Sequence, residues 1–210
     1  MEITGRIFFV TGGCSGLGLA VVKELLEQDG LVCVFDRDEE RGNSLEKDHA
    51  GGLLYQQADV RSEMETGSFN VARLVAAEIV KRNRLANTKT SPEPKEDQGV
   101  IILTSSTSYQ EGQVGQVGYA ASKGGVASMV LPMARDLAKF GIRVNGIAPS
   151  LFDTQMGKSL SPAVKNSLLK TVEYPVRFGD PREFSSNTTR CGWKNGQDLN
   201  QAYYPFERLC

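Results

Sequence analysis

Residues 7–18 of this 210-residue chain are IFFVTGGCSGLG, a short apolar run followed directly by a loop that contains four glycines. Residues 7–10 are typical of a buried strand, and apolar residues at helical spacing begin at Leu17. Glycines between a strand and a helix let the backbone turn tightly and approach a phosphate, which the free N–H groups at the helix N-terminus attract. The stretch therefore predicts a βα unit with a pyrophosphate-binding loop.

Strands and helices are expected to alternate along the rest of the chain, because short apolar runs alternate with segments of helical periodicity. This order predicts parallel βαβ units and an α/β fold of the Rossmann type, with one doubly wound parallel sheet and helices on both of its faces. From residue 185 the sequence is polar and aromatic with no strand or helix period. We therefore expect one domain over residues 1–184 and a poorly ordered polar tail over residues 185–210. The further strands are predicted at 31–35, 53–55, 100–103 and 143–148, and the helices at 17–28, 38–47, 68–82 and 119–140.

An acidic residue stands where a nucleotide ribose would lie. Asp36 ends the second predicted strand, and a carboxylate there can accept hydrogen bonds from a ribose diol but repels a 2′-phosphate, which favours NAD over NADP. The alternative is an ordinary exposed aspartate at a strand end, and the adjacent Arg37 leaves NADP open. Asp59 and Val60 follow the third predicted strand, where the residues alone indicate only a turn.

A tyrosine and a lysine form the candidate catalytic pair. Tyr119 and Lys123 are four positions apart on a predicted helix, so they share one face. An ammonium beside a phenol stabilises the phenolate, which can then exchange a proton with a substrate hydroxyl. Ser106 follows the strand at 100–103 and can hold the substrate oxygen. Such a pair alone is often only a surface helix pair, but with the upstream loop it favours an oxidoreductase that transfers hydride to or from a nicotinamide.

Composition and charge exclude several other classes of protein. The net charge of −1 gives no basis for binding nucleic acid or an anionic membrane, and no apolar run is long enough to span a bilayer. The single histidine, His49, lies in a polar segment, and the four cysteines lack metal-ligand spacing, so no metal site is expected. A methyltransferase remains a lesser alternative, because those enzymes also place a glycine-rich loop after the first strand; the Tyr119 and Lys123 pair argues against it.

Taken together, these motifs resemble the short-chain dehydrogenase/reductase family. The resemblance covers residues 5–60 and 67–184, and residues 111–144 and 148–154 are similar to the branch of type-2 3-hydroxyacyl-CoA dehydrogenases. It implies an NAD(H)-dependent enzyme of lipid metabolism that interconverts a secondary alcohol and a ketone, with a 3-hydroxyacyl-CoA or a hydroxysteroid as substrate. It also implies a homotetramer, assembled through the helices that start near Ser68 and Tyr119, and a mitochondrial location, with a cytoplasmic one as the alternative.

The resemblance also assigns roles to individual residues. Ser15 and Leu17 would contact the pyrophosphate, Lys123 would also hold the nicotinamide ribose, and Phe152 and Thr154 would contact the nicotinamide end. The implied catalytic residues are Ser106, Tyr119 and Lys123. The implied cofactor-binding residues are Gly12, Ser15, Gly16, Leu17, Gly18, Asp36, Asp59, Val60, Tyr119, Lys123, Phe152 and Thr154.

Three departures from the family pattern bear on activity. A block of about fifty residues, with the family's fourth strand, is missing between Asp59 and Gly67, by comparison with a family domain of about 250 residues. The family's final strand is replaced by the polar tail, and Ser150 stands where a glycine is usual. Either the strand at 100–103 moves to pair with the first strand, or the gap stays open. Both outcomes predict weak catalysis, so the alternative function is a catalytically impaired splice-type variant that binds a cofactor or a partner.

Overall fold

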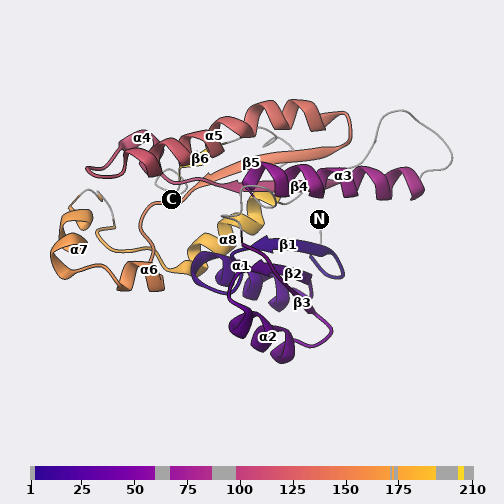
Figure 1. Cartoon of the computed structure of the whole chain (residues 1–210), viewed down its shortest axis with the longest axis horizontal. Helices are drawn as coiled ribbons and strands as arrows, with labels where there is room; N and C mark the ends of the chain where they lie inside the picture. Colours follow the sequence, from indigo (N-terminus) through magenta and orange to yellow (C-terminus); the bar gives the residue numbers. More distant parts are fainter. Residues whose placement is uncertain are drawn as a thin grey trace. The chain divides into compact units, whose positions relative to one another are not determined.

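Parallel strands alternate with helices in the computed structural model, which describes residues 3–59, 67–86, 98–170, 172, 175–192 and 203–205 (Figure 1). The predicted α/β class is therefore confirmed. The chain divides into two units, which we call unit 1 (residues 1–59 and 151–190) and unit 2 (residues 60–150 and 191–210). The predicted tail boundary between residues 184 and 185 falls inside a helix.

Unit 1 begins with three parallel strands in the order β1-β2-β3. Val32 and Val34 of β2 are buried, and the α1 residues Val22 and Leu25 are buried at helical spacing. A Cβ placed on Gly13 would touch the side chains of both Val34 and Val22, so the helix packs closely against this face of the sheet. The elements are β1 (Ile7–Thr11), α1 (Gly16–Glu27), β2 (Leu31–Asp36), α2 (Glu39–Asp48) and β3 (Leu53–Gln57).

The second part of unit 1 consists of three helices, α6 (Gln155–Lys158), α7 (Pro162–Leu169) and α8 (Pro181–Gly192). The expectation of a poorly ordered tail from residue 185 is wrong for residues 185–192, which continue α8. Ser185 and Thr189 are buried, and their hydroxyls donate to helix carbonyls within the preceding turn. Beside Phe184, the buried face of α8 is filled by these small polar side chains, so few large apolar residues mark the helix in the sequence.

Unit 2 contains the second sheet, with strand order β4-β5-β6. All seven residues of β5 are buried, and its neighbours α3 and α5 contribute apolar side chains to one core cluster. The short β6 pairs in parallel with β5, so the polar tail supplies a strand where the sequence predicted none. Three residues are too few to carry a strand period. The elements are α3 (Ser68–Ala86), β4 (Gly99–Thr104), α4 (Ser108–Glu111), α5 (Val117–Ala138), β5 (Ile142–Ala148) and β6 (Tyr203–Pro205).

The described strands form two three-stranded parallel sheets, one in each unit. Among the described strands, β1 pairs only with β2, and β4 pairs only with β5. The chain between β3 and α3 is too short to supply another strand with its crossover helix, which needs a dozen or more residues.

Candidate active site

The glycine-rich loop between β1 and α1 has the geometry that the sequence predicts. Gly12 and Gly16 have φ values of +69° and +54°, in the left-handed region that glycine adopts without steric cost. A Cβ on Gly18 would collide with the carbonyl oxygen of Gly12, so only glycine fits there. The N–H of Gly12 donates to the carbonyl of Phe35 at 2.7 Å, which ties the loop to the end of β2.

Ser15 is the N-cap of α1. Among the described residues, its side chain makes no capping hydrogen bond. The first-turn N–H groups of Gly16, Leu17 and Gly18 have no carbonyl partner within the helix, as in any helix N-terminus. No acidic residue lies in this first turn to compete for them. These donors and the helix dipole can therefore hold a pyrophosphate.

Asp36 braces this loop, a role that the sequence did not reveal. Its Oδ2 accepts a hydrogen bond from the N–H of Cys14 at 2.9 Å, and its Oδ1 accepts one from the N–H of Asp38 at 3.2 Å. Each carboxylate oxygen has a second lone pair, so Asp36 can still accept hydrogen bonds from a ribose diol. Burial and the charge of Asp36 raise the pKa of the Cys14 thiol to about 11, so this thiol stays neutral beside a phosphate site.

The loop after β5 lies beside the glycine loop within unit 1. The Thr154 methyl carbon is 3.6 Å from the position that a Cβ on Gly16 would occupy. Thr154 also caps α6, its Oγ1 accepting a hydrogen bond from the N–H of Gly157 at 3.3 Å. Phe152 is buried and its ring packs edge-on against Phe184, with centroids 5.7 Å apart. Of the two residues expected at the nicotinamide end, Thr154 is thus held next to the start of α1, and Phe152 packs against α8.

Of the two candidate residues after the third predicted strand, Asp59 and Val60, the structure describes only Asp59. Asp59 belongs to unit 1 and is half-buried, just beyond β3. The paired prediction, Val60, lies outside the described residues.

The candidate catalytic pair lies on α5 in unit 2. Lys123 Nζ is 5.8 Å from the centroid of the Tyr119 ring and donates to the carbonyl of Thr104, at the end of β4, at 3.2 Å. Burial lowers the pKa of Lys123. Tyr119 is 47% exposed, so its hydroxyl is open to a ligand.

Ser106 lies in the loop that follows β4, and it is buried. Its Oγ is 3.2 Å from the Oγ of Ser108 and accepts the N–H of the same residue. The preceding Ser105, which the sequence did not single out, donates its hydroxyl to the carbonyl of Lys123 at 2.7 Å. Ser105 thereby ties the catalytic helix to the loop that carries Ser106; the adjacent serines were the only sequence signal for it.

The structure therefore sorts the predicted site residues into two groups. Unit 1 holds the glycine loop, Asp36, Asp59, Phe152 and Thr154, and unit 2 holds Ser106, Tyr119 and Lys123. A sequence model of the short chain dehydrogenase family matches residues 6–81 and 65–165. The chain belongs to the short-chain dehydrogenase family.

Individual members of the family are similar to this short-chain dehydrogenase over most of its sequence. It is 33% identical to 3-hydroxyacyl-CoA dehydrogenase type-2 of Rattus norvegicus, over 88% of this chain and 87% of that protein. It is 30% identical to acetoacetyl-CoA reductase of Synechocystis sp., over 88% and 87% of the two chains. The crystal structure of 3-hydroxyacyl-CoA dehydrogenase type-2 from Mycobacterium avium superposes with a TM-score of 0.80 at 26% identity, over 96% of this chain and 94% of that one.

The alignment with the rat protein supports the expected missing block. It spans 236 positions, whereas 88% of 210 residues is about 185, so about 50 aligned positions have no counterpart in this short-chain dehydrogenase. The family model likewise matches in two pieces that meet between residues 65 and 81. Family members use a nicotinamide nucleotide, NAD or NADP, and the glycine loop with Asp36 fits such a group.

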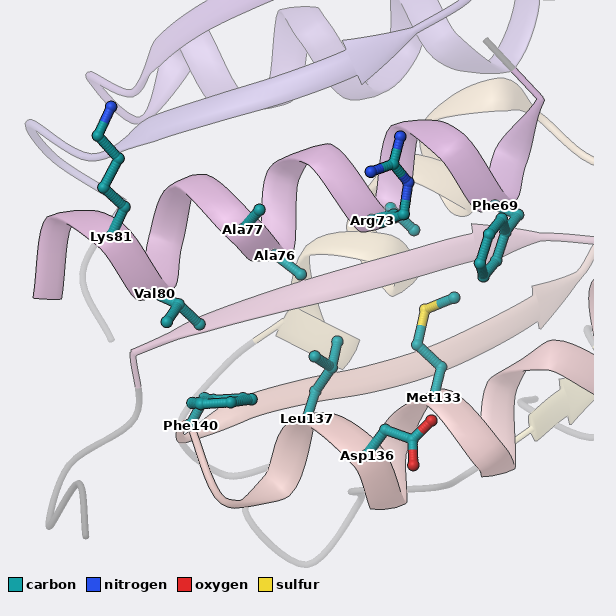
Figure 2. A pocket seen from close by; sticks show the side chains of 11 residues that line it. Phe69, Arg73, Ala76, Ala77, Val80, Lys81, Met133, Asp136, Leu137 and Phe140 are labelled. Carbon is teal, nitrogen blue, oxygen red and sulfur yellow. The ribbon is translucent and has the colours of Figure 1, made fainter. Parts of the chain in front are cut away.

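A groove of about 580 Å³ runs between α3 and α5 of this short-chain dehydrogenase (Figure 2). Phe69 and Val80 of α3 and Met133 and Leu137 of α5 point into the space between the helices. The remaining lining includes Arg73 and Asp136, which have opposite charges. The groove lies on the helices that the family resemblance assigns to assembly.

The described residues contain neither a membrane-spanning helix nor a cluster of metal ligands. No helix there is long and apolar enough to cross a membrane. No cluster of three or more metal-binding side chains was found among the same residues.

Proposed function

We propose that this short-chain dehydrogenase transfers hydride between NAD(H) and a carbon that bears a secondary alcohol or ketone. The observation that carries the proposal is the placement of Lys123 beside the exposed Tyr119, one helical turn away, with Ser106 in the loop at the end of β4. This is the residue set that proton transfer to or from a hydroxyl requires.

In the proposed reaction, residues of this chain would accept the proton and position the substrate. When bound, NAD supplies the hydride acceptor. In the oxidation direction, the substrate hydroxyl gives its proton to the Tyr119 oxygen as the carbon loses hydride, and a ketone remains. The ammonium of Lys123 stabilises the phenolate that takes this proton. The bond from Lys123 to the Thr104 carbonyl holds the ammonium in place, and the Ser106 hydroxyl holds the substrate oxygen.

We propose NAD rather than NADP as the cofactor. Asp36 presents a carboxylate at the end of β2, and both of its oxygens accept backbone N–H groups that fix its position. A fixed carboxylate repels a 2′-phosphate and accepts hydrogen bonds from a free ribose diol. Calorimetric titration with NADH and NADPH tests this choice; tighter binding of NADPH would contradict it.

We propose an acyl thioester with oxygen at carbon three as the substrate, with a hydroxysteroid as the second candidate. Relatives at 33% and 30% identity are named 3-hydroxyacyl-CoA dehydrogenase type-2 and acetoacetyl-CoA reductase. The test is the loss of NADH absorbance when the purified chain is mixed with acetoacetyl-CoA, with Tyr119→Phe as the control. A chain that binds NADH but consumes it with neither acetoacetyl-CoA nor an oxosteroid would contradict the proposal.

We further propose that the chain assembles with copies of itself through the groove between α3 and α5, up to the tetramer that the family resemblance implies. The groove is lined by apolar side chains from both helices, by two basic residues, Arg73 and Lys81, and by one acidic residue, Asp136. A two-fold axis through such a face brings each residue of one copy against the same face of the other, so Arg73 can pair with Asp136 across it. Light scattering of the purified protein tests the assembly.

We also propose a mitochondrial location, as the family resemblance implies. Fluorescence imaging of the chain with a C-terminal tag tests it, and a uniform cytoplasmic signal would contradict it.

A further inference from the structure

Tyr55 is a half-buried residue of β3, and its hydroxyl makes one hydrogen bond to the backbone. Its register partner on β2 is Val34, two residues before Asp36. The Tyr55 hydroxyl donates to the backbone carbonyl of Asp36 at 2.9 Å. Its ring packs against Gly42 of α2, so closely that a Cβ on Gly42 would overlap the ring.

The Asp36 carbonyl is held from two sides by this contact. It accepts the Tyr55 hydroxyl and also the N–H of Ala58, both at 2.9 Å, so both of its lone pairs are used. The carboxylate of the same residue accepts hydrogen bonds from the N–H groups of Cys14 and Asp38. The position of the carboxylate therefore depends on the carbonyl being fixed.

The Tyr55 hydroxyl is a donor that stays protonated. Burial raises its pKa, and the negative charges of Asp36, Glu39 and Asp38 raise it further. The Tyr55 hydroxyl therefore remains available at neutral pH to donate to the Asp36 carbonyl.

We propose that Tyr55 is a positioning residue for the cofactor's adenosine ribose, acting through the backbone of Asp36. This inference rests on the proposed use of NAD(H). Tyr55 does not touch the ribose; it fixes the end of β2 so that the Asp36 carboxylate accepts the ribose diol and repels a 2′-phosphate. Loss of the hydroxyl would therefore lower both the affinity for NADH and the preference over NADPH.

The test compares Tyr55→Phe with the wild type by calorimetric titration with NADH and with NADPH. Tyr55→Phe keeps the ring against Gly42 and removes only the hydroxyl. One lost hydrogen bond predicts an NADH affinity about fivefold weaker, with a smaller change for NADPH, so the ratio of the two affinities falls. Leu54→Ala is the matched control, because Leu54 is the neighbour on β3, points to the opposite face and is 59% exposed. It should leave both affinities unchanged.

A double-mutant cycle separates positioning from a general loss of packing. In an Asp36→Ala background, adding Tyr55→Phe should weaken NADH binding no further. A full-sized effect in that background, or an unchanged NADH to NADPH ratio in Tyr55→Phe alone, would overturn the inference while leaving the proposed function standing. A wild-type chain that binds neither nucleotide would instead overturn the proposed function, and this inference with it.

Discussion

The ammonium of Lys123 lies 5.8 Å from the ring centroid of Tyr119 and is anchored on the Thr104 carbonyl at the end of β4. The anchor matters because the lysine is held by a strand end as well as by its own helix. Its charge is therefore fixed with respect to both the tyrosine and the loop that carries Ser106.

Removing the Tyr119 hydroxyl should abolish turnover without abolishing cofactor binding. General acid–base groups contribute about 10²- to 10⁴-fold to rate, so Tyr119→Phe should lower kcat by that order. Tyr119 lies in unit 2, whereas the glycine loop lies in unit 1. Steady-state kinetics with acetoacetyl-CoA and NADH titration together check both parts, and a variant with unchanged kcat would contradict the assignment.

Activity should fall at alkaline pH because burial lowers the pKa of Lys123 below its usual 10.5. As pH rises through this lowered value the ammonium is lost, and with it the support for the Tyr119 phenolate. The sign for stability is opposite: between the lowered pKa and 10.5 the unfolded chain binds more protons, so stability from this group rises with pH. A kcat profile and melting temperatures over this range check the two signs, and Lys123→Met should remove both trends.

Gly18→Ala should destabilise the chain and eliminate NADH binding. The added Cβ would overlap the carbonyl oxygen of Gly12, and overpacking against backbone costs about 1–3 kcal/mol. Gly125→Ala is the control, because nothing lies within 4 Å of its added Cβ and the change should stabilise α5 by about 0.5–1 kcal/mol. Thermal melts with and without NADH check both variants; equal NADH-induced shifts in Gly18→Ala and wild type would contradict the model of the loop.

The start of α8 should lose stability in acid. Asp180 accepts hydrogen bonds from the Arg182 side chain and backbone, which lower its pKa from 3.8 to about 2. A depressed acid pKa adds stability above the unfolded value, and this is lost as pH falls from about 4 to about 2. The group is exposed and screened, so the effect is small. Melting temperatures of wild type and Asp180→Asn should differ at pH 6 to 7 and converge as pH falls to about 2.

Reversing the charge of Arg73 in the groove between α3 and α5 should weaken assembly. Reversing the charges of Arg73 and Asp136 together should restore it. Arg73→Glu places two acidic groups opposite each other if Asp136 of a second copy faces this residue. The double variant with Asp136→Arg restores opposite charges. Light scattering of the three proteins at low salt gives the test; a double variant that stays as dissociated as Arg73→Glu would argue against a two-fold contact on this face.

Turnover should be at least a hundredfold slower than that of the rat 3-hydroxyacyl-CoA dehydrogenase type-2. About 50 aligned positions of the rat protein have no counterpart in this chain, and the family resemblance implies that this block carries the strand over which the cofactor lies. Hydride transfer loses about a hundredfold for an error of 1 Å. Parallel kinetics of the two proteins check this. Equal rates would refute it, and binding without turnover would favour a role in binding a cofactor or a partner.

The local chemistry of this protein was determined by the sequence itself. The glycine loop, the strand before it and the start of the helix after it lie within twelve residues, 7–18, and the Tyr119 and Lys123 pair lies within one helical turn. Such features depend on backbone conformation and spacing over a few positions, so they can be predicted without knowing the partners. The missing block was visible by comparison with the family pattern, which places a further strand between Asp59 and Gly67.

Contacts between distant segments were decided only by the tertiary structure. Thr154 lies beside Gly16, and β6 pairs with β5, because burial and strand pairing bring together segments that no local period connects. The polar helix through Ser185 escaped prediction since its buried hydroxyls are satisfied by the helix backbone rather than by apolar contacts.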